Sequence, residues 1–120
     1  MTWLHSTWTA VALAGAAVLT AQPAFAASGL LVRGEALLTK NCARCHAIGV
    51  TGDSQHEKAP PFRQIVTRYP LDNLAEALAE GIVSGHADMP EFVFEPGDID
   101  AILAYLDDIK SKTNGDAPKQ

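Results

Sequence analysis

The feature that most constrains this chain is a pair of cysteines followed at once by a histidine, Cys42-Ala43-Arg44-Cys45-His46. Thiols at this spacing can add to the vinyl groups of a haem, and the adjacent imidazole can then reach the iron from one side of the ring. A disulfide, a redox-active cysteine pair and half of a zinc site are the alternatives for such cysteines. We predict that Cys42 and Cys45 hold a haem covalently and that His46 is an axial ligand.

The first 26 residues are typical of a signal peptide. Residues 9–21 form an uncharged run of 13 residues, which suits the apolar core of a leader and is short for a membrane span of about 20 residues. Ala24-Phe25-Ala26 fits the small-x-small cleavage pattern, so we expect export and cleavage after Ala26. Because no Lys or Arg precedes the apolar run, an uncleaved anchor stays the alternative, and contact with a membrane is expected only in that case.

The rest of the chain is expected to form one small domain over residues 27–110, followed by a flexible tail over residues 111–120 that has no large apolar residue. So short a chain has few side chains for a core, and a central haem would supply the missing apolar mass.

Apolar periodicity predicts an all-α fold, because no segment alternates convincingly as a strand would. The expected helices lie at residues 30–41, at 62–69 as a short helix or turn, from about Leu71 to a stop at Gly81, and from Pro96 through Ile109. The expected loops lie at residues 49–61 and 82–94. Gly34 interrupts the first helix at a cost of about 1 kcal/mol relative to alanine, so we expect another helix to approach closely there.

With these pieces in order, residues 34–106 resemble a class I mono-haem cytochrome c of the small bacterial type. That family has a glycine and a large apolar or aromatic residue eight and four positions before the first haem cysteine, where this chain has Gly34 and Leu38. They pack against a last helix whose apolar-x-x-Tyr-Leu pattern matches Ile102, Tyr105 and Leu106. The resemblance implies three to five helices wrapped round one covalently bound haem c, with the N- and C-terminal helices packed together.

The resemblance also implies how the iron is held. The family's second axial ligand is a methionine before the last helix, and Met89-Pro90 matches it, 43 residues after His46. In that family, the carbonyl of a proline in a Gly/Ala-Pro-x-Leu/Phe segment accepts a hydrogen bond from the axial imidazole. Ala59-Pro60-Pro61-Phe62 matches this segment, so the resemblance implies that Pro60 accepts that hydrogen bond here. The alternatives are that Met89 only fills a gap in the core, or that His56 or His86 takes its place on the iron.

The predicted site residues fall into two groups by role. The metal ligands are His46 and Met89. The other cofactor-binding residues are Cys42, Cys45 and Pro60, together with Phe62, Phe92 and Phe94, which we expect to pack on the faces of the haem. The alternative for the three phenylalanines is that they are ordinary core aromatics.

Charge is strongly segregated along the chain. The formal net charge is −5; residues 33–68 hold six basic and three acidic residues, whereas residues 72–108 hold ten acidic and no basic ones. No basic run with interleaved aromatics indicates nucleic acid as a partner. The asymmetry is a solvated surface at the least, and it also predicts that electrostatics orient the protein as it meets an oppositely charged partner.

The resemblance therefore implies a periplasmic one-electron carrier rather than an enzyme. We expect a monomer with a membrane complex or dehydrogenase as electron donor, an oxidase or reductase as acceptor, and no small-molecule substrate. One alternative is a haem c subunit of a larger oxidoreductase. The other is a ligand-binding sensor or peroxidase-like enzyme in which Met89 is absent from the iron.

Overall fold

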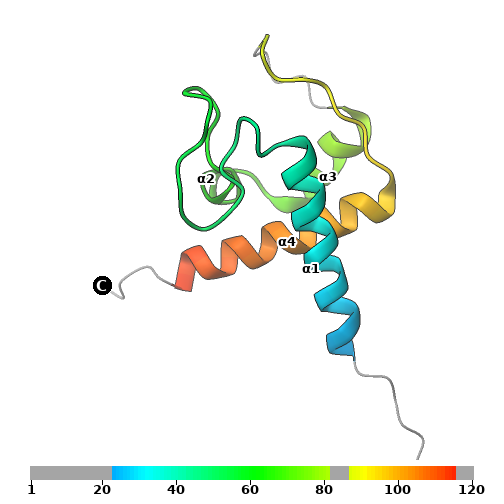
Figure 1. The fold of residues 1–120 in the computed structure, drawn as a ribbon. Helices are drawn as coiled ribbons and strands as arrows, with labels where there is room; N and C mark the ends of the chain where they lie inside the picture. Colours follow the sequence, from blue (N-terminus) through cyan, green and yellow to red (C-terminus); the bar gives the residue numbers. More distant parts are fainter. Residues whose placement is uncertain (1–22, 82–86, 116–120) are drawn as a thin grey trace, which may run out of the picture.

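The computed structural model describes residues 23–81 and 87–115 (Figure 1). These residues form four helices and no strand, so the prediction of an all-α fold is confirmed. The helices are α1 (Pro23–Asn41), α2 (Phe62–Arg68), α3 (Leu71–Glu80) and α4 (Pro96–Gly115). Within the described ranges no helix is both long and apolar enough to cross a bilayer. Most of the expected signal peptide, and His86, lie outside the described residues.

The two terminal helices of the domain, α1 and α4, cross at Gly34 (Figure 1). A Cβ atom at Gly34 would overlap the backbone carbonyl of Ala101 and would lie 2.8 Å from Cβ of Tyr105. Only glycine permits so close an approach of two backbones. Arg33 adds an ion pair across the crossing, with Nε 2.9 Å from Oδ1 of Asp98. The expected contact at Gly34, and the packing of the N- and C-terminal helices, are confirmed.

The core is built around α4, against which the other three helices all pack. Leu38 of α1 and Ile102 and Leu106 of α4 are each 1% exposed. Val66 of α2 and Leu78 of α3 reach the same cluster from the other side of α4. Because α4 supplies most of the buried side chains, it is the element that positions the rest of the domain.

The boundaries of α3 follow the sequence prediction. The helix begins at Leu71, directly after Pro70, and it ends before Gly81. Gly81 has a φ of 98°, in the region that favours glycine, and its N–H donates to the Ala77 carbonyl at 2.9 Å. The N–H of Phe94 donates to the Leu78 carbonyl at 2.9 Å, so the chain that leads into α4 is tied to the end of α3.

Two helix ends differ from the expectation. Helix α1 begins at Pro23 instead of Leu30, and it therefore runs through the expected cleavage site after Ala26. Phe25 in this first part is 85% exposed. Because its side chain does not pack on the core, it adds nothing to the apolar periodicity from which the helix was predicted. Alanine-rich sequence continues the helix by propensity alone.

Helix α4 continues to Gly115, beyond the expected end at Ile109, so residues 111–115 of the expected tail are helical. The apolar stripe ends at Ile109, but local contacts extend the helix beyond it. Nζ of Lys112 lies 2.6 Å from the Asp108 carboxylate, one turn earlier, and the Thr113 hydroxyl donates to the Ile109 carbonyl at 2.8 Å. Residues 116–120 lie outside the described part of the chain.

Candidate functional site

Cys42, Cys45 and His46 lie on one tight turn at the end of α1. The N–H groups of Cys42 and Ala43 both donate to the Leu38 carbonyl, at 2.8 and 3.0 Å. Those of Cys45 and His46 both donate to the Cys42 carbonyl, at 3.0 and 2.9 Å. The turn thus continues the winding of the helix and keeps the thiols and the imidazole together. Both thiols are free and half-buried, which does not agree with the disulfide alternative.

The environment of Cys42 also disfavours a redox-active cysteine pair. Burial, and secondarily the charge of Cys45, raise the pKa of the Cys42 thiol to about 11. Thiols that attack disulfides have lowered pKa values, because the thiolate is the nucleophile. Cys42 is therefore a neutral thiol at neutral pH in the chain without its cofactor.

The imidazole of His46 is oriented by Pro60, near the end of the loop of residues 47–61 that follows the turn. Nδ1 of His46 lies 2.7 Å from the carbonyl oxygen of Pro60, so the hydrogen bond implied by the resemblance is present. A carbonyl can only accept, so Nδ1 carries the proton and Nε2 keeps its lone pair for a metal. The centroid of the Phe62 ring lies 5.3 Å from that of the imidazole, at a tilt of 50°. The backbone N–H of Phe62 donates to the Ala47 carbonyl at 2.9 Å.

Two further contacts, neither of them predicted, hold the loop of residues 47–61 against the turn. The hydroxyl of Ser54 accepts a hydrogen bond from the Ala47 N–H at 3.0 Å. The N–H of His56 donates to the Cys45 carbonyl at 3.1 Å. Serine and histidine in a polar loop are usually solvated, and neither lies in a periodic pattern. The sequence singled out His56 only as an alternative iron ligand, and no sequence signal indicated these two contacts.

Met89 lies in a non-helical segment, residues 87–95, between α3 and α4. Its side chain is half-buried. Just before it, the Asp88 carboxylate lies 3.6 Å from Nε2 of His56. Just after it, Phe92 and Phe94 stack with ring centroids 6.0 Å apart and an interplanar angle of 27°. The role of Met89 as a ligand, and of these rings in haem packing, stay predictions.

The residues of the turn and the half-buried apolar side chains of the core fit a haem. The side chains that pack on the core while keeping part of their surface exposed are Leu37, Cys42, Ile48, Phe62, Leu71, Leu74, Ala75, Phe94 and Leu103. Apolar surfaces of this kind, together with free thiols and an imidazole whose Nε2 is available, suit a flat apolar ring that is tethered at one edge. Within the described ranges no group of three His, Cys, Asp or Glu side chains could hold a bare metal ion. The half zinc site therefore has no second half there.

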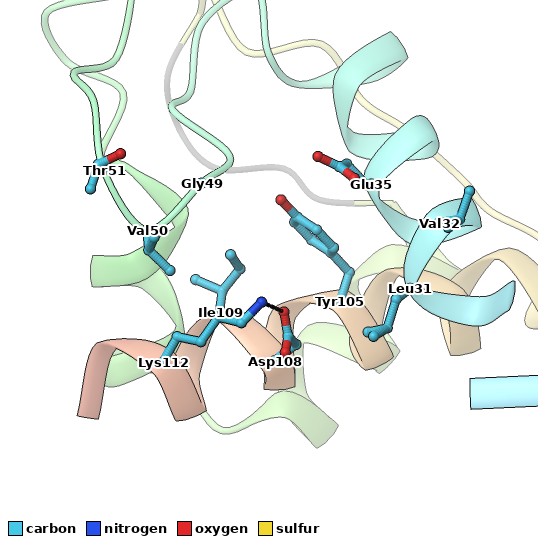
Figure 2. A pocket seen from close by; sticks show the side chains of 10 residues that line it. All are labelled: Leu31, Val32, Glu35, Gly49, Val50, Thr51, Tyr105, Asp108, Ile109 and Lys112. Carbon is cyan, nitrogen blue, oxygen red and sulfur yellow. Dashed lines mark hydrogen bonds and ion pairs between the residues drawn. The ribbon is translucent and has the colours of Figure 1, made fainter. Parts of the chain in front are cut away.

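A groove of about 380 Å³ lies elsewhere, between α1, α4 and residues 49–51 (Figure 2). Leu31 and Val32 of α1 and Ile109 of α4 line it, and the Tyr105 ring lies between Ile109 and α1 (Figure 2). Burial raises the pKa of Tyr105, and the nearby Glu35 carboxylate adds to the effect. None of the predicted cofactor residues lines this groove.

Comparison with known proteins agrees with the geometry of the turn. The family model that describes cytochrome c matches residues 31–110 of the chain. The matched stretch is 80 of the 120 residues and contains every predicted cofactor residue. The comparison with curated proteins finds no match.

Proposed function

Because the chain belongs to the cytochrome c family, we propose that it is a periplasmic carrier of single electrons with one haem c. Cys42 and Cys45 hold the haem covalently, and His46 and Met89 are its axial ligands. One observation supports this above all: two free thiols share a turn with an imidazole whose Nδ1 is hydrogen-bonded to the Pro60 carbonyl.

When bound, the haem supplies an iron that exchanges one electron between Fe(II) and Fe(III). The Pro60 carbonyl keeps His46 in the tautomer whose Nε2 can ligate, and the hydrogen bond increases the basicity of that nitrogen. The thioether of Met89 is a weak donor that favours Fe(II) and so raises the reduction potential. Since the protein fills both axial positions, it leaves none for a substrate.

The half-buried apolar side chains at the edge of the core serve the same function. Phe62, Leu74 and Phe94 are half-buried against the core, and a ring packed on them is shielded from water. A low-polarity pocket raises the reduction potential. The donor loses one electron and the acceptor gains one, while no covalent bond in the chain is made or broken.

The physiological partner is proposed to present a basic surface. Asp72, Glu76 and Glu80 lie one helical turn apart and are all exposed on α3, and like charges at this spacing destabilise a helix. No basic residue lies in the last turn of α3, where one would interact favourably with the helix dipole. A cationic partner would offset this repulsion and would be steered toward it.

Oxidation of the reduced holoprotein by a cationic oxidant of higher potential, tris(1,10-phenanthroline)cobalt(III), should therefore slow as ionic strength rises, because salt screens charges beyond about 10 Å at 0.1 M. Stopped-flow traces at several salt concentrations measure this, with anionic ferricyanide as the comparison. The triple variant Asp72→Asn, Glu76→Gln, Glu80→Gln should flatten the salt dependence with the cation. An equal dependence in the wild type and the triple variant would exclude α3 as the docking surface.

Met89→Ala should remove one axial ligand and open the iron. The reduced variant should bind carbon monoxide rapidly, and its potential should fall by on the order of 0.1 V, a part of the roughly 0.8 V over which axial ligands tune haem. Optical spectra of the oxidised and reduced protein with and without carbon monoxide, together with a redox titration, measure both effects. Val93→Ala is the matched control, because Val93 lies in the same segment and is 67% exposed. An unchanged spectrum and potential in Met89→Ala would rule out the proposed ligation.

A further inference from the structure

His56 connects the two segments that carry the proposed axial ligands. Its backbone N–H donates to the Cys45 carbonyl at 3.1 Å, directly before His46. Its side chain extends to the other segment, where Nε2 lies 3.6 Å from Oδ2 of Asp88, directly before Met89. One residue thus contacts both the turn of residues 42–46, here called the attachment turn, and the segment of residues 87–95, here called the methionine segment.

The hydrogen bonds of the imidazole define its tautomer. The backbone N–H of Lys58 donates to Nδ1 of His56 at 3.2 Å, so Nδ1 is an acceptor and carries no proton. The proton of the neutral ring is therefore on Nε2, which faces the Asp88 carboxylate. The attraction between Nε2–H and the carboxylate does not depend on a second proton on the ring. Nδ1 of His56 accepts the hydrogen bond from Lys58, and Nε2 carries the proton and faces Asp88, which disfavours His56 as an alternative iron ligand.

The contact with Asp88 lies at an important point of the methionine segment. On the C-terminal side of Met89, the next hydrogen bond to a helix in the described ranges is that from the Phe94 N–H to the Leu78 carbonyl. The Asp88 carboxylate is thus placed to restrain the backbone immediately before the thioether.

We propose that His56 is a positioning residue for Met89: through Asp88 it holds the methionine segment against the attachment turn and so slows the release of the thioether from the iron. This inference rests on the proposed function, because it requires Met89 to be an axial ligand. The side chains of His56 and Asp88 are 36% and 75% exposed, and even a fully ionic contact at such exposure shifts an equilibrium by no more than about fivefold.

The test is the rate at which carbon monoxide binds to the reduced holoprotein, since the gas can bind only when Met89 has left the iron. His56→Asn keeps an acceptor near the position of Nδ1 but is too short to reach Asp88, and Asp88→Asn removes the carboxylate charge. Each variant should bind carbon monoxide about two- to fivefold faster than the wild type. His56→Gln carries its amide nitrogen at about the reach of Nε2 and should restore a rate near that of the wild type.

Asp53→Asn is the matched control for charge, because Asp53 is an exposed carboxylate of the same loop, and its rate should not change. The double variant His56→Asn, Asp88→Asn should be no faster than either single variant, because both remove the same contact. Rates for His56→Asn and Asp88→Asn equal to that of Asp53→Asn would overturn the inference. If His56→Asn fails to incorporate haem, Asp88→Asn alone decides it.

Met89→Ala, measured beside them, separates the two levels of the proposal. Fast binding in Met89→Ala with unchanged rates in the His56 and Asp88 variants would overturn only the positioning role of His56. Binding in Met89→Ala no faster than in the wild type would overturn both the ligation by Met89 and the inference that depends on it.

Discussion

His46→Ala should yield essentially no stable holoprotein. The variant removes the only nitrogen ligand that the attachment turn offers, and the iron would then lack its ligand on that side of the ring. It also removes the hydrogen that Nδ1 donates to the Pro60 carbonyl at 2.7 Å. A partly buried acceptor left without a donor costs about 1–3 kcal/mol, so the loop that carries Pro60 and Phe62 should loosen as well.

The measurement is the haem content per polypeptide after expression with haem-maturation machinery, from absorbance and intact mass. His56→Ala is the matched control, because it also removes an imidazole, from the loop of residues 47–61 that follows the turn, but leaves Nε2 of His46 in place. That variant should keep full haem content. A normal yield of red protein from His46→Ala, with an unchanged spectrum, would contradict the assignment of His46 as the axial ligand.

Gly34→Ala should destabilise the protein by about 1–3 kcal/mol, which is the usual cost of overpacking a tight contact. The added methyl group would overlap the Ala101 carbonyl, and Cβ of Tyr105 would lie 2.8 Å from it. The carbonyl belongs to the backbone of α4 and cannot rotate away as the end of a flexible side chain would. Helices α1 and α4 must therefore separate, and this opens the core around Leu38, Ile102 and Leu106.

Denaturant unfolding of the holoprotein, followed by circular dichroism, measures this loss. Gly29→Ala is the control in the same helix, since a Cβ at Gly29 meets nothing within 4 Å. That variant should be as stable as the wild type or slightly more so, because alanine favours a helix over glycine. Equal stability of the Gly34 and Gly29 variants would show that the crossing tolerates a larger separation of the helices.

Much of this molecule could be predicted because its strongest signals are local. Cys42, Cys45 and His46 lie within a single turn of chain, so their neighbourhood follows from their spacing without knowledge of the fold. The cost of Gly34 in a helix indicated a close approach, and the structure places the Ala101 carbonyl there. The stop at Gly81 followed from its tolerance of positive φ, and a φ of 98° is what it adopts.

The expected ends of α1 and α4 were wrong because each helix extends beyond the part that packs against the core. Apolar periodicity reports only the part of a helix that faces a core, so it found α1 from Leu30 and lost α4 after Ile109. The first turns of α1 and the last turns of α4 continue through propensity and contacts between neighbouring turns. Such contacts do not produce an apolar stripe.

The amino-acid sequence by itself determined the helical class, the turn that brings Cys42, Cys45 and His46 together, and the point at which the terminal helices cross. Only the tertiary structure decided which polar groups of different loops meet, above all that His56 contacts both the Cys45 carbonyl and the Asp88 carboxylate. The physical reason is that a helix or a tight turn is specified by neighbours along the chain. A meeting of two loops depends instead on how the packed helices place the ends of those loops, and exposed polar side chains leave no periodic trace of it.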